Sequence, residues 1–318
     1  MASTSIPSSM SERIRWPDGK DFAFTIFDDT DGATCATVRD VYAFVRDCGL
    51  RTTKSVWPVR GQHTPVNGGD TCAEPEYRAW VVKLQSLGFE IGYHMTTYHS
   101  SVREETQAGL ETFAHLFGQY PATMANHVGC TENLYWGSAR VSGVHQVLYN
   151  LLTLYRNHNK FRGHIAGDAH FWGDMCQAKV RYVRNFVFPE INTLKACPWM
   201  PYHDPQRPFV NYWYSASEGA DIKSFNRMLA EKNQDRLEAE HGACIMYTHF
   251  GKGFYQNGVD RQFQRLMQRL SQKNGWFVPV STLLDYIVQT RGHHTITDQE
   301  RKRLERKWLL AKVIIGTT

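Results

Sequence analysis

Short apolar runs and longer amphipathic segments alternate along the first part of the chain. Residues 21–27 are rich in aromatic and β-branched side chains, which is typical of a buried strand. A polar turn follows, and apolar residues then recur at helical spacing from Val38 to Val45. The same pattern predicts strands at 52–59, 89–93 and 122–126 and helices at 75–87 and 102–116. Strand, polar loop and helix in alternation predict βα units around a parallel sheet.

The pattern is irregular between residues 133 and 217, where Tyr, Trp, Pro and His are frequent. We expect long connections there, and parts of a cleft wall. Regular spacing returns with predicted strands at 243–247 and 276–280 and predicted helices at 259–270 and 281–289. No repeat or low-complexity linker divides the chain. We therefore predict an N-terminal extension (1–20), one α/β barrel domain with a long irregular insertion (21–290), and a C-terminal helix with a tail (291–318).

The predicted C-terminal helix is amphipathic and basic. Thr297 and Glu300 have the spacing of a capping box, and Leu304, Trp308 and Ala311 recur at helical spacing. Six basic and three acidic residues between 298 and 312 place a net +3 of the chain's +5 on this segment. The helix either packs on the barrel or docks to a partner subunit or an anionic membrane surface. Because the remaining charge is close to neutral and no nucleic-acid motif is present, we predict no nucleic-acid partner.

Composition limits the class of protein. The 318 residues are 42% hydrophobic and 21% charged, which is typical of a globular protein and excludes disorder as its main state. No apolar run approaches the ~20 residues of a membrane span. The first ten residues lack a basic start and an apolar stretch, and the seven cysteines are scattered without a C-x-x-C pair. These features predict a cytoplasmic protein without a disulfide framework.

Candidate chemistry lies where three predicted strands end. Asp28 and Asp29 follow the first strand, His94 and His99 follow the strand at 89–93, and His249 follows the strand at 243–247. Each group alone has a structural interpretation, such as a turn cap or a buried, hydrogen-bonded histidine. Ligands bind at the carboxyl ends of parallel strands, however, so the agreement of three ends favours one site. Carboxylate and imidazole groups are common ligands of divalent metals.

The spacing of the two histidines restricts the local structure. Five residues apart on a regular helix, His94 and His99 would diverge by about 140°. They can reach one ion only if the segment is a loop, which Thr96, Thr97 and Ser100 favour.

Three motifs resemble those of the polysaccharide deacetylases, the carbohydrate esterases of family four with a NodB-like homology domain. They are Thr25-Ile-Phe-Asp-Asp29, Glu90-Ile-Gly-Tyr-His94 with His99-Ser100, and the late strand ending before His249. The segment 275–286 resembles the closing strand and helix of that family. The resemblance spans roughly residues 20–290 and identifies the chain as a divergent member.

The resemblance implies a distorted (β/α) barrel that holds a divalent metal, with zinc expected first and Co, Ni or Fe as alternatives. Asp29, His94 and His99 would be the metal ligands. Asp28 would be the general base and His249 the general acid in the removal of an N-acetyl or other acyl group from a saccharide. A cytoplasmic location would favour a lipid-linked or nucleotide-linked saccharide as the substrate.

The sequence departs from the family pattern at two places. The family has His-x-x-x-His, whereas one extra residue separates His94 from His99. Where the family has an arginine that orients the base, residues 124–129 contain none. Asn126 or His127 would supply the missing hydrogen bond, or His127 would be a ligand.

Other residues could also complete the site. Asp31 is a spare ligand or a neighbour of the ligands, and Arg181 or Arg184 could replace the missing arginine in space. The polar run 164–174 predicts a substrate-facing loop with Trp172 as an aromatic platform and Asp174 beside it, with a second metal site as the alternative.

Two other functions fit the same residues. The altered motifs favour a barrel that binds a saccharide without hydrolysing it. The irregular middle segment favours hydrolysis of another amide, C–N or ester bond by the same chemistry.

Overall fold

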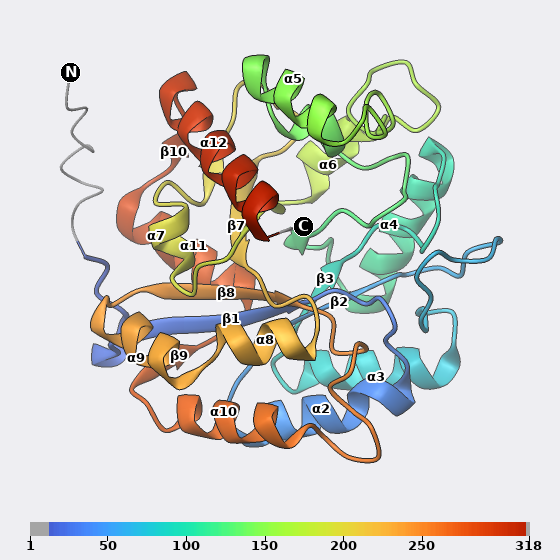
Figure 1. Cartoon of the computed structure of the whole chain (residues 1–318). Coiled ribbons are helices and arrows are strands. Elements are labelled where there is room, and N and C mark those ends of the chain that lie inside the picture. The colour runs from blue at the N-terminus through green and yellow to red at the C-terminus, as the bar shows by residue number, and fades with distance from the viewer. Residues whose placement is uncertain (1–12, 316–318) are drawn as a thin grey trace, which may run out of the picture.

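The computed structural model describes residues 13–315 and contains a closed barrel of seven parallel strands (Figure 1). Around the barrel they are β1 (Phe22–Asp28), β2 (Thr53–Val56), β3 (Glu90–Tyr93), β4 (Thr123–Met124), β5 (Tyr182–Phe188), β7 (Tyr212–Ser217) and β8 (Ala243–Thr248). The barrel closes because β8 pairs with both β7 and β1. Three short strands extend it, namely β6 (Tyr202–His203), β9 (Gly275–Phe277) and β10 (His294–Thr295). The predicted (β/α) barrel is confirmed.

Helices cover the outside of the barrel. The predicted helices of the two regular regions are α2 (Cys35–Asp47), α3 (Pro75–Ser86), α4 (Arg103–Phe117), α10 (Arg261–Ser271) and α11 (Val280–Arg291). In Figure 1, α2, α3 and α10 lie together along one side of β1. The apolar spacing in α2 turns Val38, Val41 and Val45 toward the core, where they are fully buried. All seven residues of β1 are buried, as expected of a strand covered on both faces.

The middle segment corrects the sequence analysis, because it contributes two barrel strands where we expected irregular connections. In β5 the polar Arg184 and Asn185 interrupt an otherwise apolar run, and in β7 Ser215 and Ser217 do the same. All four side chains are buried. The polar interruptions hide both strands from a pattern search, and one of them, Arg184, pairs with Asp29 inside the barrel. The remaining short helices are η1 (Pro17–Gly19), η2 (Gly137–Arg140), α5 (Gly143–Leu152), α6 (Gly173–Lys179), α7 (Thr193–Ala196), α8 (Ile222–Met228) and α9 (Glu231–Ala239).

The predicted C-terminal helix is α12 (Asp298–Ile315), and it packs on the barrel domain beside α5 (Figure 1). Its capping box is confirmed, since Thr297 N donates to Glu300 Oε2 at 2.8 Å and Glu300 N donates to Thr297 Oγ1 at 3.3 Å. Trp308 is fully buried and stacks on Tyr149 of α5 with ring centroids 5.8 Å apart. The domain limits at residues 20 and 290 stay predictions, and residues 1–12 and 316–318 lie outside the described part.

Within residues 13–315, no helix is both long enough and apolar enough to cross a lipid bilayer.

Candidate metal centre and active site

Three carboxylates lie at the end of β1. Asp28, the last residue of the strand, is the least exposed of them. The strand register sets Asp28 between Lys54 of β2 and Thr248 of β8. Its Oδ2 accepts a hydrogen bond from the Tyr42 hydroxyl at 2.9 Å and lies 3.0 Å from Lys54 Nζ, while its Oδ1 accepts from Phe250 N at 2.7 Å. Both oxygens are therefore engaged inside the protein, and the side chain has no exposed surface. Lys54, Tyr42 and the Phe250 amide thus enclose Asp28 within the protein, and its role as general base stays a prediction.

Asp29 is paired with an arginine from the middle segment. Arg184 on β5 donates from Nη1 to Asp29 Oδ1 at 2.8 Å and from Nη2 to Oδ2 at 2.6 Å. Burial would raise the pKa of Asp29, but the charge and hydrogen bonds of Arg184 outweigh it and hold the pKa below its usual value. Asp29 Oδ2 also lies 3.9 Å from His94 Nε2 and 4.0 Å from His249 Nε2. Of the two arginines considered as replacements, Arg184 takes the position.

Asp31, His94 and His127 form a buried cluster of possible metal ligands, all 3% exposed or less. Asp31 Oδ1 lies 3.0 Å from His127 Nδ1 and 3.4 Å from His94 Nε2, and the two nitrogens lie 3.1 Å apart. The structure thus groups His94 most closely with Asp31 and His127, the two spare candidates, while Asp29 lies slightly farther away at 3.9 Å. It is the one such group of three among the described residues.

The donor atoms of this cluster fit a divalent cation. Ligand atoms of a tetrahedral zinc at about 2.0–2.1 Å lie roughly 3.3–3.4 Å from one another, close to the three distances seen here. Asp31 Oδ1 accepts no hydrogen bond from the described residues, although both nitrogens are near it. Burial lowers the pKa of His94, which favours the neutral imidazole that a metal requires. The surrounding histidines lower the pKa of Asp31 despite its burial, so that the carboxylate is ionised.

Two asparagines hold the loop that presents His127. Asn133 accepts from His127 N at 3.2 Å and donates to His127 O at 2.6 Å. Asn126 does the same to Leu134, donating to its carbonyl and accepting from its amide, both at 3.0 Å. Each side chain thus replaces the two backbone hydrogen bonds of a strand partner, and the loop after β4 is fixed although it has no regular structure.

A contact between two glycines brings His249 to the cluster. Gly32 has φ +72°, and a Cβ on Gly251 would lie 2.3 Å from the Gly32 carbonyl carbon, so the two loops cross at backbone distance. His249 Nδ1 lies 2.6 Å from the Ala220 carbonyl and therefore carries a proton, and His249 Nε2 lies 3.0 Å from Asp31 Oδ2. The structure thus brings the predicted acid His249 to the same strand ends as His94.

A hollow of about 190 Å³ opens over these groups, and its lining includes Asp29, Asp31, His94 and His249. Trp136 and Tyr247 add aromatic wall, and Asn67, Asn126 and Lys252 add polar groups. Sequence analysis missed Trp136 and Lys252, which carry no motif signal. It also missed Lys54, although a lysine inside a buried strand is itself a signal because such residues need a partner.

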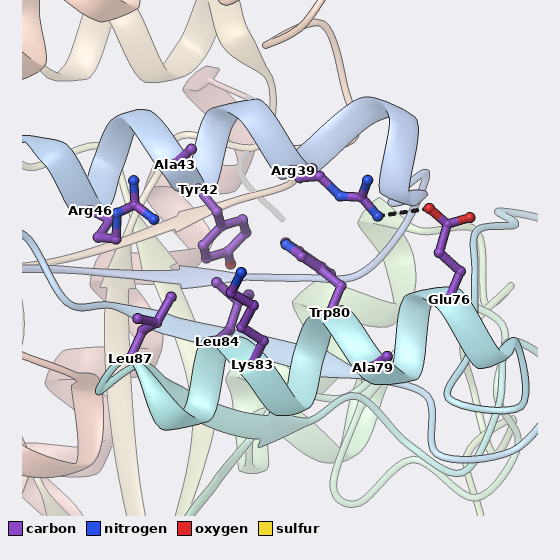
Figure 2. Close-up of a pocket in the computed structure, with 10 residues that line it drawn as sticks. All are labelled: Arg39, Tyr42, Ala43, Arg46, Glu76, Ala79, Trp80, Lys83, Leu84 and Leu87. Atoms are coloured by element: carbon purple, nitrogen blue, oxygen red, sulfur yellow. Dashed lines mark hydrogen bonds and ion pairs between the residues drawn. The ribbon is translucent and has the colours of Figure 1, made fainter.

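A larger hollow of about 420 Å³ lies outside the barrel, between α2 and α3 (Figure 2). Figure 2 shows the ion pair of Arg39 and Glu76 bridging the two helices, with Tyr42 of α2 and Trp80 of α3 pointing into the space between them. The two hollows differ in chemistry, because this one contains no convergent histidine or carboxylate cluster. We therefore place the candidate site at the smaller hollow.

Three other predicted site residues lie elsewhere. His99 Nε2 accepts a hydrogen bond from Gln62 N at 2.7 Å, and its Nδ1 lies 2.8 Å from the Ser100 carbonyl. The segment from His94 to His99 is a loop, as its spacing required, but the loop turns His99 toward residues 61–63 and away from the cluster. His99 is therefore not grouped with His94, contrary to the prediction.

Trp172 and Asp174 do not form a substrate platform. Trp172 is fully buried, and its indole nitrogen donates to the Glu132 carbonyl at 2.7 Å. Asp174 forms a partly exposed ion pair with Arg103, with Nη2 and Oδ2 2.6 Å apart. The buried ring of Trp172 is thus no exposed platform, and neither residue is among those that line the hollow described above.

We compared the chain with family models, curated proteins and solved structures. No family model matches the sequence, and no curated protein matches it. Among solved structures, the chain is similar to one described as a candidate polysaccharide deacetylase from Mycobacterium smegmatis, with a TM-score of 0.52, 11% identity, and 90% of this chain and 96% of that chain covered. It is also similar to Puue allantoinase, with a TM-score of 0.50, 11% identity, and coverage of 87% and 94%. The resemblance is confirmed for the fold: this chain has the barrel of the polysaccharide deacetylases and of allantoinase.

Proposed function

We propose that the protein is a metal-dependent hydrolase that removes an acyl group, N-acetyl first, from a saccharide. The observation that supports this most is the convergence of Asp31 Oδ1, His94 Nε2 and His127 Nδ1 within 3.0–3.4 Å of one another. Asp31, His94 and His127 would hold a divalent ion, zinc first. When bound, such an ion polarises a carbonyl oxygen and lowers the pKa of a water molecule in its open position.

Asp29 is the general base in this proposal, in place of Asp28. Its lowered pKa keeps the carboxylate ionised at neutral pH, and Arg184 fixes its orientation through two hydrogen bonds. Asp29 Oδ2 faces both His94 and His249 and would take a proton from the attacking water.

His249 is the general acid. The Ala220 carbonyl holds a proton on Nδ1, which leaves Nε2 directed at the carboxylates of the site. As the water oxygen bonds to the acyl carbon and the C–N bond breaks, His249 Nε2 would give its proton to the departing nitrogen. The products are a free carboxylate and an amine.

The proposed substrate is small at its reacting end. A hollow of about 190 Å³ suits an acetamido group and part of one sugar ring, with Trp136 and Tyr247 available to pack on an apolar sugar face. Nucleotide-linked and lipid-linked N-acetylated sugars are the first substrates to test. A second candidate is the hydrolysis of another amide or C–N bond, which the similarity in fold to allantoinase supports.

The metal is tested first. Protein purified without chelators should contain close to one equivalent of a divalent metal, measured by elemental mass spectrometry. The Asp31→Asn and His94→Ala variants should lose this metal. A wild-type protein that takes up no zinc, cobalt, nickel or iron, even when supplied in excess, would contradict the proposal.

Turnover separates the candidate activities. The metal-loaded protein is incubated with N-acetylated sugars, their nucleotide-linked forms and a panel of cyclic and linear amides, and released carboxylate and amine are measured. Acetate from the sugars supports deacetylation, and amine release only from the other amides supports the second candidate. Saccharide binding without any release would favour the non-hydrolytic barrel.

A further inference from the structure

Helix α5 has its apolar side turned to solvent. Val144, Val147, Leu148 and Leu151 follow one another at helical spacing, and they are 67%, 54%, 46% and 55% exposed. The two residues of α5 that are buried are Tyr149 and Asn150. A surface helix normally buries its apolar stripe, so this orientation points to a covered surface in the working protein.

The apolar region continues beyond the helix. Leu152, Leu154 and Tyr155 follow at 55%, 72% and 53% exposure. We call these residues the α5 surface: Val144, Val147, Leu148, Leu151, Leu152, Leu154 and Tyr155. Ten of the fifteen large apolar side chains exposed in residues 13–314 are on this surface or on the last turns of the neighbouring α12, where they are Leu310, Val313 and Ile314.

The exposed charges in the two segments that carry these apolar side chains are basic. Residues 133–167 contain no aspartate or glutamate, and Arg156 and Lys160 stand exposed beside the apolar residues. Residues 306–315 of α12 also contain no acidic residue, and Arg306 is exposed there. A second copy of the chain would bring like charges together, whereas an anionic lipid surface is complementary to both the charge and the apolar stripe.

The α5 surface is connected to the wall of the candidate site. Trp136, which lines the hollow, lies under the Arg140 guanidinium at 3.3 Å, and Arg140 also lies 4.9 Å from the ring of Trp308. Trp308 in turn stacks on Tyr149 of α5. A chain of side-chain contacts therefore joins α5 to Trp136 in the lining of the hollow.

We propose that the α5 surface docks the protein on an anionic lipid bilayer. The apolar side chains enter the boundary between headgroups and acyl chains, Tyr155 lies at the headgroup level, and Arg156 and Lys160 contact anionic headgroups. This docking is independent of the proposed hydrolysis, and its test uses no turnover.

The test is sedimentation of the full chain with vesicles. Wild-type protein should sediment with vesicles of phosphatidylcholine containing about one-third phosphatidylglycerol, and much less with phosphatidylcholine alone or at high salt. The double substitution Val147→Glu with Leu151→Glu should reduce the bound fraction at least about tenfold. The matched control is Val82→Glu on α3, a valine that is also exposed but lies on another helix, and it should bind as the wild type does.

A second variant avoids any question of folding. Arg156→Glu with Lys160→Glu changes only exposed polar residues and should also weaken binding to the anionic vesicles. The proposal is overturned if wild-type protein fails to bind these vesicles, or if Val82→Glu loses as much binding as the α5 double variant. It is also overturned if sedimentation equilibrium shows a dimer that only the α5 substitutions dissociate, because the surface then belongs to a second copy.

Discussion

The candidate site has two walls of different origin. One wall comes from the ends of β1 and β3 and carries Asp31 and His94, in segments where the hydrophobic pattern is regular. The other comes from the loop after β4 and from β5, and it carries His127 and Arg184. Asp31 meets His127 at 3.0 Å, and Asp29 meets Arg184 at 2.6 Å, so each wall supplies groups that the other needs. The comparison shows that the histidine grouped with His94 is the one whose loop meets it in space. His99, which is nearer in the sequence, is not in that group.

The sharpest way to break this comparison is to remove one histidine from each candidate set. His127→Ala should lower zinc affinity by more than about 100-fold, because even partners that only orient a ligand are worth about 10–100-fold. His99→Ala should change the affinity little, since His99 is bound to Gln62 and Ser100 outside the cluster. Isothermal titration of the metal-free proteins measures both.

Circular dichroism on the two variants provides the control for folding. If His99→Ala lost the metal and His127→Ala kept it, the ligand set would be that of the family motif, and the geometry described here would not be that of the metal-bound protein.

The second prediction concerns Arg184, in the wall formed by the loop after β4 and by β5. Arg184→Met should reduce kcat/KM for the substrate by roughly 100-fold, because the proposed base loses the two hydrogen bonds that orient it. Arg181→Met is the matched control, since Arg181 is in the same strand region but pairs with Asp285 on the surface. Metal content should stay near one equivalent in both variants.

Arg184→Lys keeps the positive charge beside Asp29 but lacks the planar pair of donors of a guanidinium group. It should therefore not restore the turnover lost in Arg184→Met. Full activity in Arg184→Met would contradict the orienting role given to Arg184.

The regular part of the chain was predictable from its pattern, and the site was predictable only in part. The strands β1, β3 and β8 and the helices α2, α3 and α4 follow from short apolar runs and helical spacing. His94, Asp29 and His249 were found because they directly follow such strands. β5 was missed because Arg184 and Asn185 interrupt its apolar run, and Arg184 is the residue that pairs with Asp29 in the barrel.

The errors at the site have physical causes. Asp28 and Asp29 are adjacent, but successive residues of an extended chain point to opposite sides. Asp28 therefore pairs with Lys54, while Asp29 lines the hollow. Trp172 in a polar run suggests exposure, yet its indole nitrogen finds the Glu132 carbonyl and the ring is buried. His127 could not be chosen over His99 without the loop closure that Asn126 and Asn133 produce.

The third prediction weakens that loop closure without removing a ligand. Asn133→Ala leaves the amide and carbonyl of His127 without their partner, so His127 should be less well held and zinc affinity should fall roughly 10–100-fold. Asn274→Ala is the matched control, because Asn274 also donates to a backbone carbonyl, that of Gly19, but on the exposed surface. Zinc titration that finds the two variants equal would contradict the role given to the asparagine pair.

The smallest effect concerns Glu132, which lies in the loop after β4. Its buried carboxyl group should make the stability of the fold depend on pH. Burial raises the pKa of this carboxyl group to about 8, whereas an unfolded chain would have it near its ordinary value. Between these two values the folded protein holds a proton that the unfolded protein has lost, so folding stability falls as the pH rises through this window. One such proton corresponds to about 1.4 kcal/mol per pH unit. From pH 6 to pH 7 the free energy of unfolding of the wild type should therefore fall by about 1.4 kcal/mol more than that of Glu132→Gln, measured by urea denaturation. Glu104→Gln, an exposed change on α4, is the control and should follow the wild type. Parallel pH profiles for Glu132→Gln and the wild type would mean that Glu132 is ionised in the folded protein, and the loop under His127 would then contain a buried charge that needs a partner.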